Sequence, residues 1–199
     1  MNKSARMTGR RKNRRPIEAR ELDQIPAWDP DSKHLNVLVD TPKGSAIKFK
    51  YDTAYRIYKI SHLLPPGTVF PFDFGSIPST LAEDGDPLDV LILMEEGSFT
   101  GCLVQVRLVG VLEAKQTQEN KTQRNDRLIG VAITSRVYEA VRSLDDLPGR
   151  RLTEIEHYFV SYNQERGRKF RPLGRFGPTR ARALVQKAEQ RYRDHQRHG

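Results

Sequence analysis

The hydrophobic pattern of the chain changes its period near residue 150, and this change restricts the possible folds more than any other feature of the sequence. Before this point, apolar residues alternate with polar ones or form short runs between Pro, Gly and Asp residues, which predicts β-strands. We expect extended segments at 36–40, 46–51, 55–60, 69–74, 89–94, 102–112 and 128–133. Gly110 interrupts one of them, and a glycine inside a strand often marks a bulge or a bend.

After residue 150 the apolar residues lie three and four positions apart, as on one face of a helix. A first stripe consists of Leu152, Ile155, Phe159 and Tyr162, and a second lies within 181–192, after Pro178. Many short strands followed by two helices indicate the α+β class, most simply a small closed or partly closed β-barrel with helices packed against it. The polar segment 116–125 has no such period and is predicted to be a loop.

The basic residues are concentrated at the two ends of the chain, which has a formal net charge of +9 overall. Residues 1–20 and 164–199 are strongly basic, and the segment between them is acidic. We expect residues 1–28 to form a basic N-terminal arm and residues 29–199 to form one domain that ends in a basic helix. The arm can bind polyanions weakly through counterion release, but a solvated tail and an Arg-rich transit peptide are alternatives.

The sequence excludes several classes of protein. No stretch approaches ~18 consecutive apolar residues, so we expect no membrane-spanning helix. Residues 1–15 are basic but lack the apolar region of a secretory signal. Cys102 is the only cysteine, which excludes an internal disulfide framework and a cysteine-based zinc site, and its apolar surroundings indicate a core thiol. These features predict a cytoplasmic protein.

Three aspartates, Asp84, Asp86 and Asp89, stand within six residues just before an apolar strand. Gly85 and Pro87 between them predict a tight turn that brings the carboxylates together. Two such charges ~4 Å apart repel by about 1 kcal/mol in water, and a hard divalent ion such as Mg²⁺ would relieve this repulsion. A solvated acidic turn is the simpler alternative. An EF-hand calcium loop is excluded, because an apolar residue and then a carboxylate occupy positions that need a ligand oxygen and a glycine.

Cations elsewhere in the sequence favour the metal interpretation. Lys48 and Lys50 alternate with apolar residues, so both project from the same face of one strand, and Asp40 ends the strand before them. Arg127 opens a later strand. Several carboxylates together with several cations suit a polyanionic substrate that metal ions bridge to the protein, as in phosphoryl transfer. Taken alone, these cations would be ordinary surface residues.

These segments together resemble the soluble family I inorganic pyrophosphatases. The resemblance covers roughly residues 36–165, and it is carried by VDTPKGSAIKFKYD (39–52), FPFDFGSIPSTLAEDGDPLDVLIL (70–93), VRLVGVL (106–112) and NDRLIGVA (125–132). It implies a five-stranded, OB-like β-barrel with flanking helices. It also implies an inorganic diphosphatase that uses Mg²⁺ and a metal-activated water to hydrolyse pyrophosphate to two phosphates, and commonly assembles into homo-oligomers.

The resemblance assigns roles to individual residues of this sequence. Asp84 and Asp89 correspond to metal ligands, and Asp86 corresponds to the carboxylate that takes a proton from the attacking water. Asp40 stands where a glutamate near the metals is usual. The residues placed at substrate-binding positions are Lys48, Tyr162, Arg127 in place of a lysine, and His62 in place of an arginine.

Several site positions depart from the family pattern. The replacements are Lys50 for a glutamate, Phe70 and Phe74 for tyrosines, Gln116 and Asn125 for metal-ligand aspartates, and Asn163 for a lysine. Asp126 could supply the carboxylate missing at Asn125, and Glu113 or Glu119 the one missing at Gln116. Two alternatives therefore stand beside pyrophosphate hydrolysis. One is a catalytically impaired protein that binds a phosphate-containing ligand or a polyanion, and the other is a hydrolase of longer polyphosphates or nucleotides.

Overall fold

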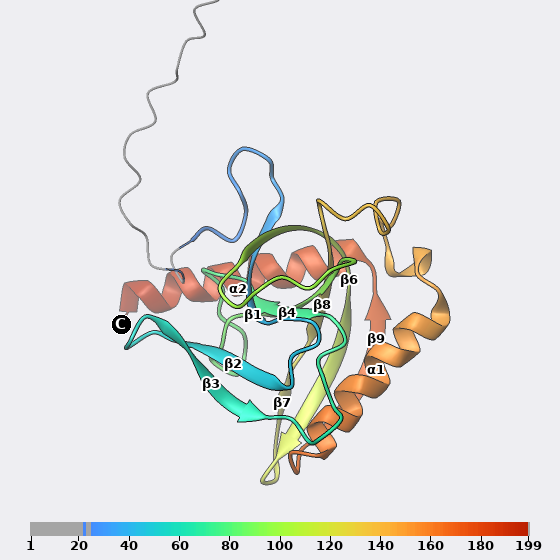
Figure 1. Ribbon diagram of the computed structural model, residues 1–199. Helices are drawn as coiled ribbons and strands as arrows, with labels where there is room; N and C mark the ends of the chain where they lie inside the picture. The colour runs from blue at the N-terminus through green and yellow to red at the C-terminus, as the bar shows by residue number, and fades with distance from the viewer. Residues whose placement is uncertain (1–21, 23–24, 199) are drawn as a thin grey trace, which may run out of the picture.

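A computed structural model of the protein describes residue 22 and residues 25–198 (Figure 1). Residues 1–20, predicted to bind polyanions, lie outside the described residues. The last residues of the predicted arm pack on the domain: Ala27 is buried, and Trp28 forms a bridge with Leu35. The Trp28 indole Nε1 also donates a hydrogen bond to Glu189 at 3.2 Å. The chain therefore joins the body of the domain at Ala27.

Five strands form a closed ring at the centre of the domain. They are β1 (Leu35–Thr41), β4 (Asp73–Ser76), β5 (Asp89–Leu93), β8 (Arg127–Ala132) and β6 (Leu103–Gln118). Each pairs with the next in this order, and β6 pairs again with β1, which closes the ring. Only the β5–β8 pairing of this ring is parallel. The α+β class and the five-stranded, OB-like architecture predicted from the sequence agree with this topology.

The structure differs from the sequence-based expectations in three segments. The predicted loop 116–125 instead forms a hairpin, in which the end of β6 pairs with β7 (Lys121–Arg124). Strand β9 (Lys169–Phe176), which pairs with β6, was not predicted. The hairpin is rich in polar residues and lacks the alternation that identifies a strand, and β9 contains Pro172 and Gly174, which are unfavourable in strands. The extended segment expected at 69–74 becomes strand only from Asp73 onward, because β4 begins there.

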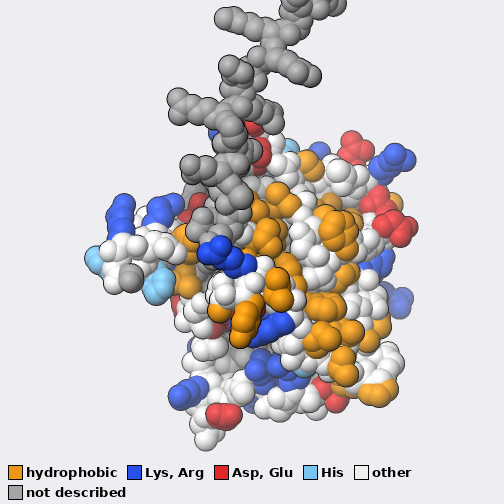
Figure 2. All heavy atoms as spheres, turned by 60° about the vertical axis from the view of Figure 1, so that its left-hand side comes forward, with side chains coloured by type: hydrophobic (Ala, Val, Ile, Leu, Met, Phe, Trp, Pro, Cys, Tyr) orange, Lys and Arg blue, Asp and Glu red, His pale blue; other side chains and the backbone are white. Residues whose placement is uncertain are grey.

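Strands β2 (Ile47–Asp52) and β3 (Ile57–Leu63) form a separate two-stranded sheet beside the ring (Figure 1). Large apolar side chains are exposed on and near this hairpin: Tyr55, Ile57, Ile60 and Leu63. Figure 2 shows that apolar side chains cover a broad part of one face of the domain.

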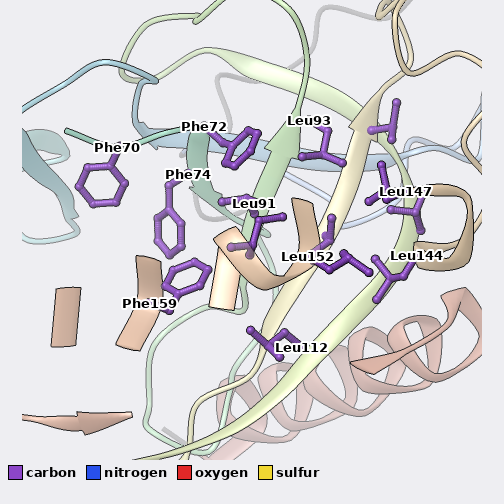
Figure 3. Packing of buried hydrophobic residues seen from close by; sticks show 14 of the residues in the cluster. Phe70, Phe72, Phe74, Leu91, Leu93, Leu112, Leu144, Leu147, Leu152 and Phe159 are labelled. Atoms are coloured by element: carbon purple, nitrogen blue, oxygen red, sulfur yellow. The ribbon is translucent and has the colours of Figure 1, made fainter. Parts of the chain in front are cut away.

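The two helices occupy the positions that the apolar stripes predict. Helix α1 (Gly149–Gln164) buries Leu152, Ile155 and Phe159, and α2 (Pro178–His198) buries Ala181, Val185 and Ala188. Figure 3 shows the cluster beneath α1, where Phe159 meets Phe74 and Leu152 approaches the short 3₁₀ helix η2 (Leu144–Asp146). Among the described residues, no helix is both long and apolar enough to cross a membrane.

Gly110 marks a bulge in β6, as the sequence predicts, since the pairing register with β8 shifts between Leu108 and Gly110. A Cβ atom at Gly110 would lie 2.4 Å from Leu144 Cγ and 2.5 Å from the carbonyl oxygen of Phe176, so only glycine fits without rearrangement. The irregularity lets one 16-residue strand pair with β1 near its start and with β7 and β9 toward its end.

Candidate active site

The acidic turn between β4 and β5 is closed by hydrogen bonds within its own backbone. The Ala82 N–H donates to the carbonyl oxygen of Asp86 at 2.8 Å, and the Gly85 N–H donates to that of Ala82 at 3.3 Å. Gly85 has a φ of +87°, a conformation that glycine adopts without strain. The turn therefore gathers the three predicted carboxylates, Asp84, Asp86 and Asp89, at the entrance of β5.

Asp84 is a partly buried carboxylate that forms no ion pair with a described residue, although the charge of Arg127 acts on it from further away. Burial raises the pKa of its carboxyl group, and the negative charges of Asp89 and Asp86 raise it further. Asp84 and Asp89 line one cavity of about 270 Å³. Arg124, Arg180, Lys187 and Arg191 line the same cavity, so a cation would be stabilised only where it lies against the two carboxylates, whose mutual repulsion it would reduce.

Asp40, at the end of β1, is a buried carboxylate close to the turn. Burial raises its pKa to about 7; the charge of Lys48 opposes this shift and that of Asp89 adds to it. The Ser76 hydroxyl donates to Asp40 Oδ1 at 3.3 Å. Asp40 lines a cavity of about 390 Å³ together with Asp86 and Asp89. We define the carboxylate cluster as Asp40, Asp84, Asp86 and Asp89.

Lys50 reaches across this cavity to Asp86. The two side chains form an ion pair with 2.8 Å between Lys50 Nζ and Asp86 Oδ1, and they are 53% and 55% exposed. Exposed pairs of this kind are worth little stability because water screens them. The ion pair therefore orients the Asp86 carboxylate while leaving it accessible to water and substrate.

Lys48, from the same strand as Lys50, lies against two aromatic rings. Its Nζ is 4.1 Å from the ring centroid of Phe74 and 5.6 Å from that of Phe70. Burial lowers the pKa of the Lys48 ammonium group, and the charges of Asp40 and Asp89 oppose this shift. The two phenylalanines that replace expected tyrosines thus hold the ammonium group by cation–π contact.

Two amides and an arginine form a hydrogen-bonded group beside Asp89. Asn125 Nδ2 donates to Gln116 Oε1 at 2.8 Å, and Asn125 Oδ1 accepts a hydrogen bond from Arg127. Arg127 Nη1 also forms an ion pair with Asp89 Oδ2 at 2.5 Å. Where the resemblance implies two metal-binding aspartates, this chain therefore has neutral amides that bind each other. Glu119 lies at the exposed tip of the β6–β7 hairpin.

The other carboxylates considered as replacements already have partners. Asp126 Oδ1 accepts from the Ala114 N–H at 2.9 Å, and its Oδ2 accepts from Arg124 Nη2 at 2.9 Å. Glu113 pairs with Arg124 at 2.8 Å and with Arg180 at 2.6 Å. Arginines and a backbone amide therefore bind the oxygens of these two carboxylates, and Asp126 lines the same cavity as Asp84 and Asp89.

His62 and Tyr162, predicted to bind substrate, meet directly. The Tyr162 hydroxyl is 3.0 Å from His62 Nε2 and accepts a hydrogen bond from Arg166 Nη1 at 3.0 Å. Burial lowers the pKa of the His62 imidazole to about 4, and the charges of Arg166, Lys48 and Arg168 add to this shift. His62 is therefore neutral near pH 7 and does not replace the charge of an arginine.

Asn163 contributes no charge either, since its side chain is used inside helix α1. It is buried, and its Nδ2 donates to the carbonyl oxygen of Phe159 at 2.8 Å. The lysine implied at this position thus has no functional replacement at the same place in the chain.

Two arginines that sequence reasoning did not select, Arg166 and Arg168, lie beside these residues. They line a cavity of about 110 Å³ that we call the cationic cavity. Its other polar lining residues are Lys48, Asp89, Gln116, Asn125, Arg127, Tyr162 and Asn163. The sequence does contain a signal for these residues. The segment Arg-Gly-Arg places two basic residues around a glycine shortly after Tyr162, where the predicted apolar stripe ends.

Comparison with known proteins identifies related sequences over most of the chain. The family model described as inorganic pyrophosphatase matches residues 37–193. An inorganic pyrophosphatase of Synechocystis is 36% identical over 71% of this chain and 81% of its own length. The inorganic pyrophosphatase of Methanosarcina acetivorans is 34% identical over 79% of this chain and 91% of its own length.

Solved structures with the same architecture carry the same description. The inorganic pyrophosphatase of Thermus thermophilus superimposes with a TM-score of 0.79 at 30% identity, covering 87% of this chain and 99% of that one. The inorganic pyrophosphatase of Neisseria gonorrhoeae superimposes with a TM-score of 0.77 at 26% identity, covering 86% of this chain and 98% of that one.

Proposed function

The chain belongs to the inorganic pyrophosphatase family and hydrolyses inorganic pyrophosphate to phosphate, and on this premise we propose how its own residues carry out the reaction. One observation carries the proposal. Asp89 lines the cavity that contains Asp84, the cavity that contains Asp86, and the cationic cavity. A metal, a base and phosphate-binding cations can therefore act on one substrate around this residue.

The family implies a divalent metal cofactor, and we propose that it is Mg²⁺ held by Asp84 and Asp89. Within the described part of the chain, no three His, Cys, Asp or Glu side chains are placed to enclose a metal ion by themselves. Mg²⁺ fits such a site, because it commonly binds one or two carboxylates and completes its coordination with water and substrate phosphates. The absence of an ion pair at Asp84 among the described residues also fits this assignment. When bound, Mg²⁺ acidifies a water molecule and offsets phosphate charge.

Asp40 is proposed as a supporting carboxylate near the metal rather than a direct ligand. It is buried, it interacts electrostatically with Lys48 and Asp89, and it lines a different cavity from Asp84. Asp126 is left out of the proposed ligand set, because Ala114 and Arg124 bind both of its oxygens.

Asp86 is proposed as the general base. Its carboxylate is half-exposed and is oriented by Lys50, so it can accept the proton of the water that attacks phosphorus. Lys48, Arg127 and the Tyr162 hydroxyl bind the phosphate oxygens, where they stabilise the negative charge that accumulates on the leaving phosphate. His62 orients the Tyr162 hydroxyl through the 3.0 Å contact between them.

Assembly and location complete the proposal. We propose that the chain forms homo-oligomers in the cytoplasm. Two observations support the assembly: the exposed apolar side chains of the β2–β3 hairpin and the apolar face in Figure 2. Exposed apolar patches often mark interaction surfaces. Weak polyanion binding by residues 1–20 is proposed from their charge alone.

Phosphate release from pyrophosphate tests the catalytic assignment. We expect turnover of ~1–10³ s⁻¹ by the purified protein in millimolar Mg²⁺. Asp86→Asn should lower kcat by about 10²–10⁴-fold, the usual worth of a general base, while circular dichroism shows an intact fold. Turnover that is equal in both proteins would remove Asp86 from its proposed role. A folded wild type without turnover would favour the impaired, ligand-binding alternative.

Thermal melting tests the metal assignment without relying on turnover. Mg²⁺ that binds only the folded state raises the melting temperature. We expect millimolar Mg²⁺ to stabilise the wild type and to leave an Asp84→Asn, Asp89→Asn double variant unshifted. An equal shift in both proteins would place the metal elsewhere.

A further inference from the structure

We propose that Arg166 and Arg168 form a phosphate-binding subsite that holds inorganic phosphate, or one phosphoryl group of pyrophosphate, without a metal ion. The proposal rests on the function proposed above. It adds two binding residues from the connection between α1 and β9, a segment to which neither the motifs nor the resemblance assigned a role.

The backbone after α1 turns both arginines back toward the cavity. The N–H groups of Arg166 and Arg168 both donate to the carbonyl oxygen of Asn163, at 3.0 and 2.9 Å. Gly167 between them has a φ of +67°, which permits the reversal without strain. This short turn therefore holds both side chains at the lining of the cationic cavity.

The charge of this pair is not balanced by protein groups. Within the described residues, no Asp or Glu side chain forms an ion pair with Arg166 or Arg168. Other arginines of the domain do have carboxylate partners: Arg124, Arg127, Arg175, Arg180 and Arg191. Arg107, Arg142 and Arg182 also form no ion pair with a described residue, but Arg166 and Arg168 differ from them in lining one cavity together, where an anion between the two guanidinium groups would balance their charge.

The neighbouring groups point to a phosphate in particular. Arg166 shares the Tyr162 hydroxyl with His62, so a guanidinium and a phenol stand together at the cavity. Lys48 lines the same cavity and contributes an ammonium group held against aromatic rings. Guanidinium groups bind tetrahedral oxyanions with paired N–H donors, and a phosphate has enough oxygens to accept from several cations at once.

The two arginines also supply what the chain lacks elsewhere. His62 is neutral near pH 7, and Asn163 uses its amide within α1, so two positions expected to be cationic are not. Arg166 and Arg168 place two positive charges at the cavity that Asn163 lines, and Arg166 also lines a neighbouring cavity with His62. The two arginines thus replace cationic groups that are absent at His62 and Asn163. They lie near these residues in the structure but stand at other positions of the sequence.

Titration calorimetry of the full-length protein with inorganic phosphate in EDTA tests the proposal. We expect the wild type to bind phosphate without metal, and an Arg166→Gln, Arg168→Gln double variant to bind at least about tenfold more weakly, because charge-assisted hydrogen bonds are strong. The matched control is Lys169→Gln, Arg171→Gln, which also removes two positive charges, from nearby β9, but neither residue lines the cavity. Its affinity should equal that of the wild type.

Kinetics separate this proposal from the proposed function. In Mg²⁺, the double variant should raise KM for pyrophosphate about tenfold with a smaller change in kcat, and Arg166→Lys, Arg168→Lys should fall between it and the wild type. A wild type that binds phosphate but does not hydrolyse pyrophosphate would overturn the proposed function and keep the subsite. Unchanged phosphate affinity and KM in a folded, active double variant would overturn the subsite alone.

Discussion

The carboxylate cluster and the cationic cavity meet at Asp89, yet they are built from the chain in different ways. Three of the four carboxylates come from one tight turn of consecutive residues, Asp84 to Asp89. The cationic cavity takes Lys48 from β2, Arg127 from β8, and further residues from α1 and the connection after it. The cluster is therefore a local structure, whereas the cavity exists only once the barrel and α1 have packed.

The two regions also differ in which charge they lack. In the cluster, Asp84 has no cation partner among the described residues, so this region is completed by a cation. In the cavity, Arg127 is bound to Asp89 and Asn125, while Arg166 and Arg168 have no carboxylate partner in the described part of the chain. A metal–pyrophosphate complex supplies both missing charges at once, which explains why the two regions adjoin.

The largest effect is expected at Asp89, the residue that the two regions share. Asp89→Asn should lower kcat by about a thousandfold, because it removes a metal ligand and the partner of Arg127 together. Steady-state phosphate release measures this change. Asp126→Asn is the matched control, and its activity should stay close to wild type. A comparable loss in both variants would return Asp126 to the metal-ligand set.

Restoring carboxylates to the cavity should change how much metal the protein binds. Gln116→Asp with Asn125→Asp replaces two amides that bind each other with two charges beside Arg127. We expect the double variant to gain a Mn²⁺ site, or to bind Mn²⁺ about ten- to a hundredfold more tightly, a range typical of changes around a metal. Electron paramagnetic resonance counts the bound Mn²⁺. If the wild type and the double variant bind the same number of Mn²⁺ ions with the same affinity, the amides at Gln116 and Asn125 do not limit metal binding.

A smaller effect is expected at Lys50, which touches the cluster from outside. Lys50→Gln breaks an exposed ion pair, so the free energy of unfolding should change by no more than about 1 kcal/mol. Activity should change modestly, since Asp86 keeps its carboxylate and loses only an orienting contact. Urea denaturation and phosphate release measure the two quantities. A loss of activity as large as that of Asp86→Asn would make Lys50 essential to the base.

An effect confined to acidic pH concerns the titration of His62, which reports on the charge around the cavity. Its pKa is lowered from 6.5 to about 4, so the folded state binds its proton less readily than the unfolded state. Stability associated with neutral His62 is therefore present above pH 6.5 and is lost as the pH falls through 6.5 toward about 4. His62→Gln should flatten that part of the stability–pH curve.

The same imidazole provides a spectroscopic check on the phosphate subsite. Because the charges of Arg166 and Arg168 help to lower its pKa, a bound phosphate should raise the pKa of His62 toward its ordinary value. NMR titration of the His62 ring protons with and without phosphate measures the change. A pKa that phosphate leaves unaltered would place the anion away from Arg166 and Arg168.

Much of the fold and half of the site follow from local patterns in the sequence. The period-2 segments, the glycine in β6 and the two apolar stripes identify most strands and both helices, since each pattern is produced by the geometry of its own element. The turn that gathers Asp84, Asp86 and Asp89 is also local, because Gly85 determines its conformation. Lys48 was found because alternation fixes the face on which a strand residue lies.

Contacts between distant segments were decided only by the tertiary structure. The β6–β7 hairpin is polar and β9 contains Pro172 and Gly174, so pairing with β6, and not a hydrophobic pattern, makes them strands. The pairing of Gln116 with Asn125 depends on the register of that hairpin. Arg166 and Arg168 reach the cavity because α1 packs on the barrel and the chain then turns back at Gly167. Local geometry is encoded by neighbouring residues, whereas the meeting of side chains from separate elements depends on how the whole domain buries its apolar surface.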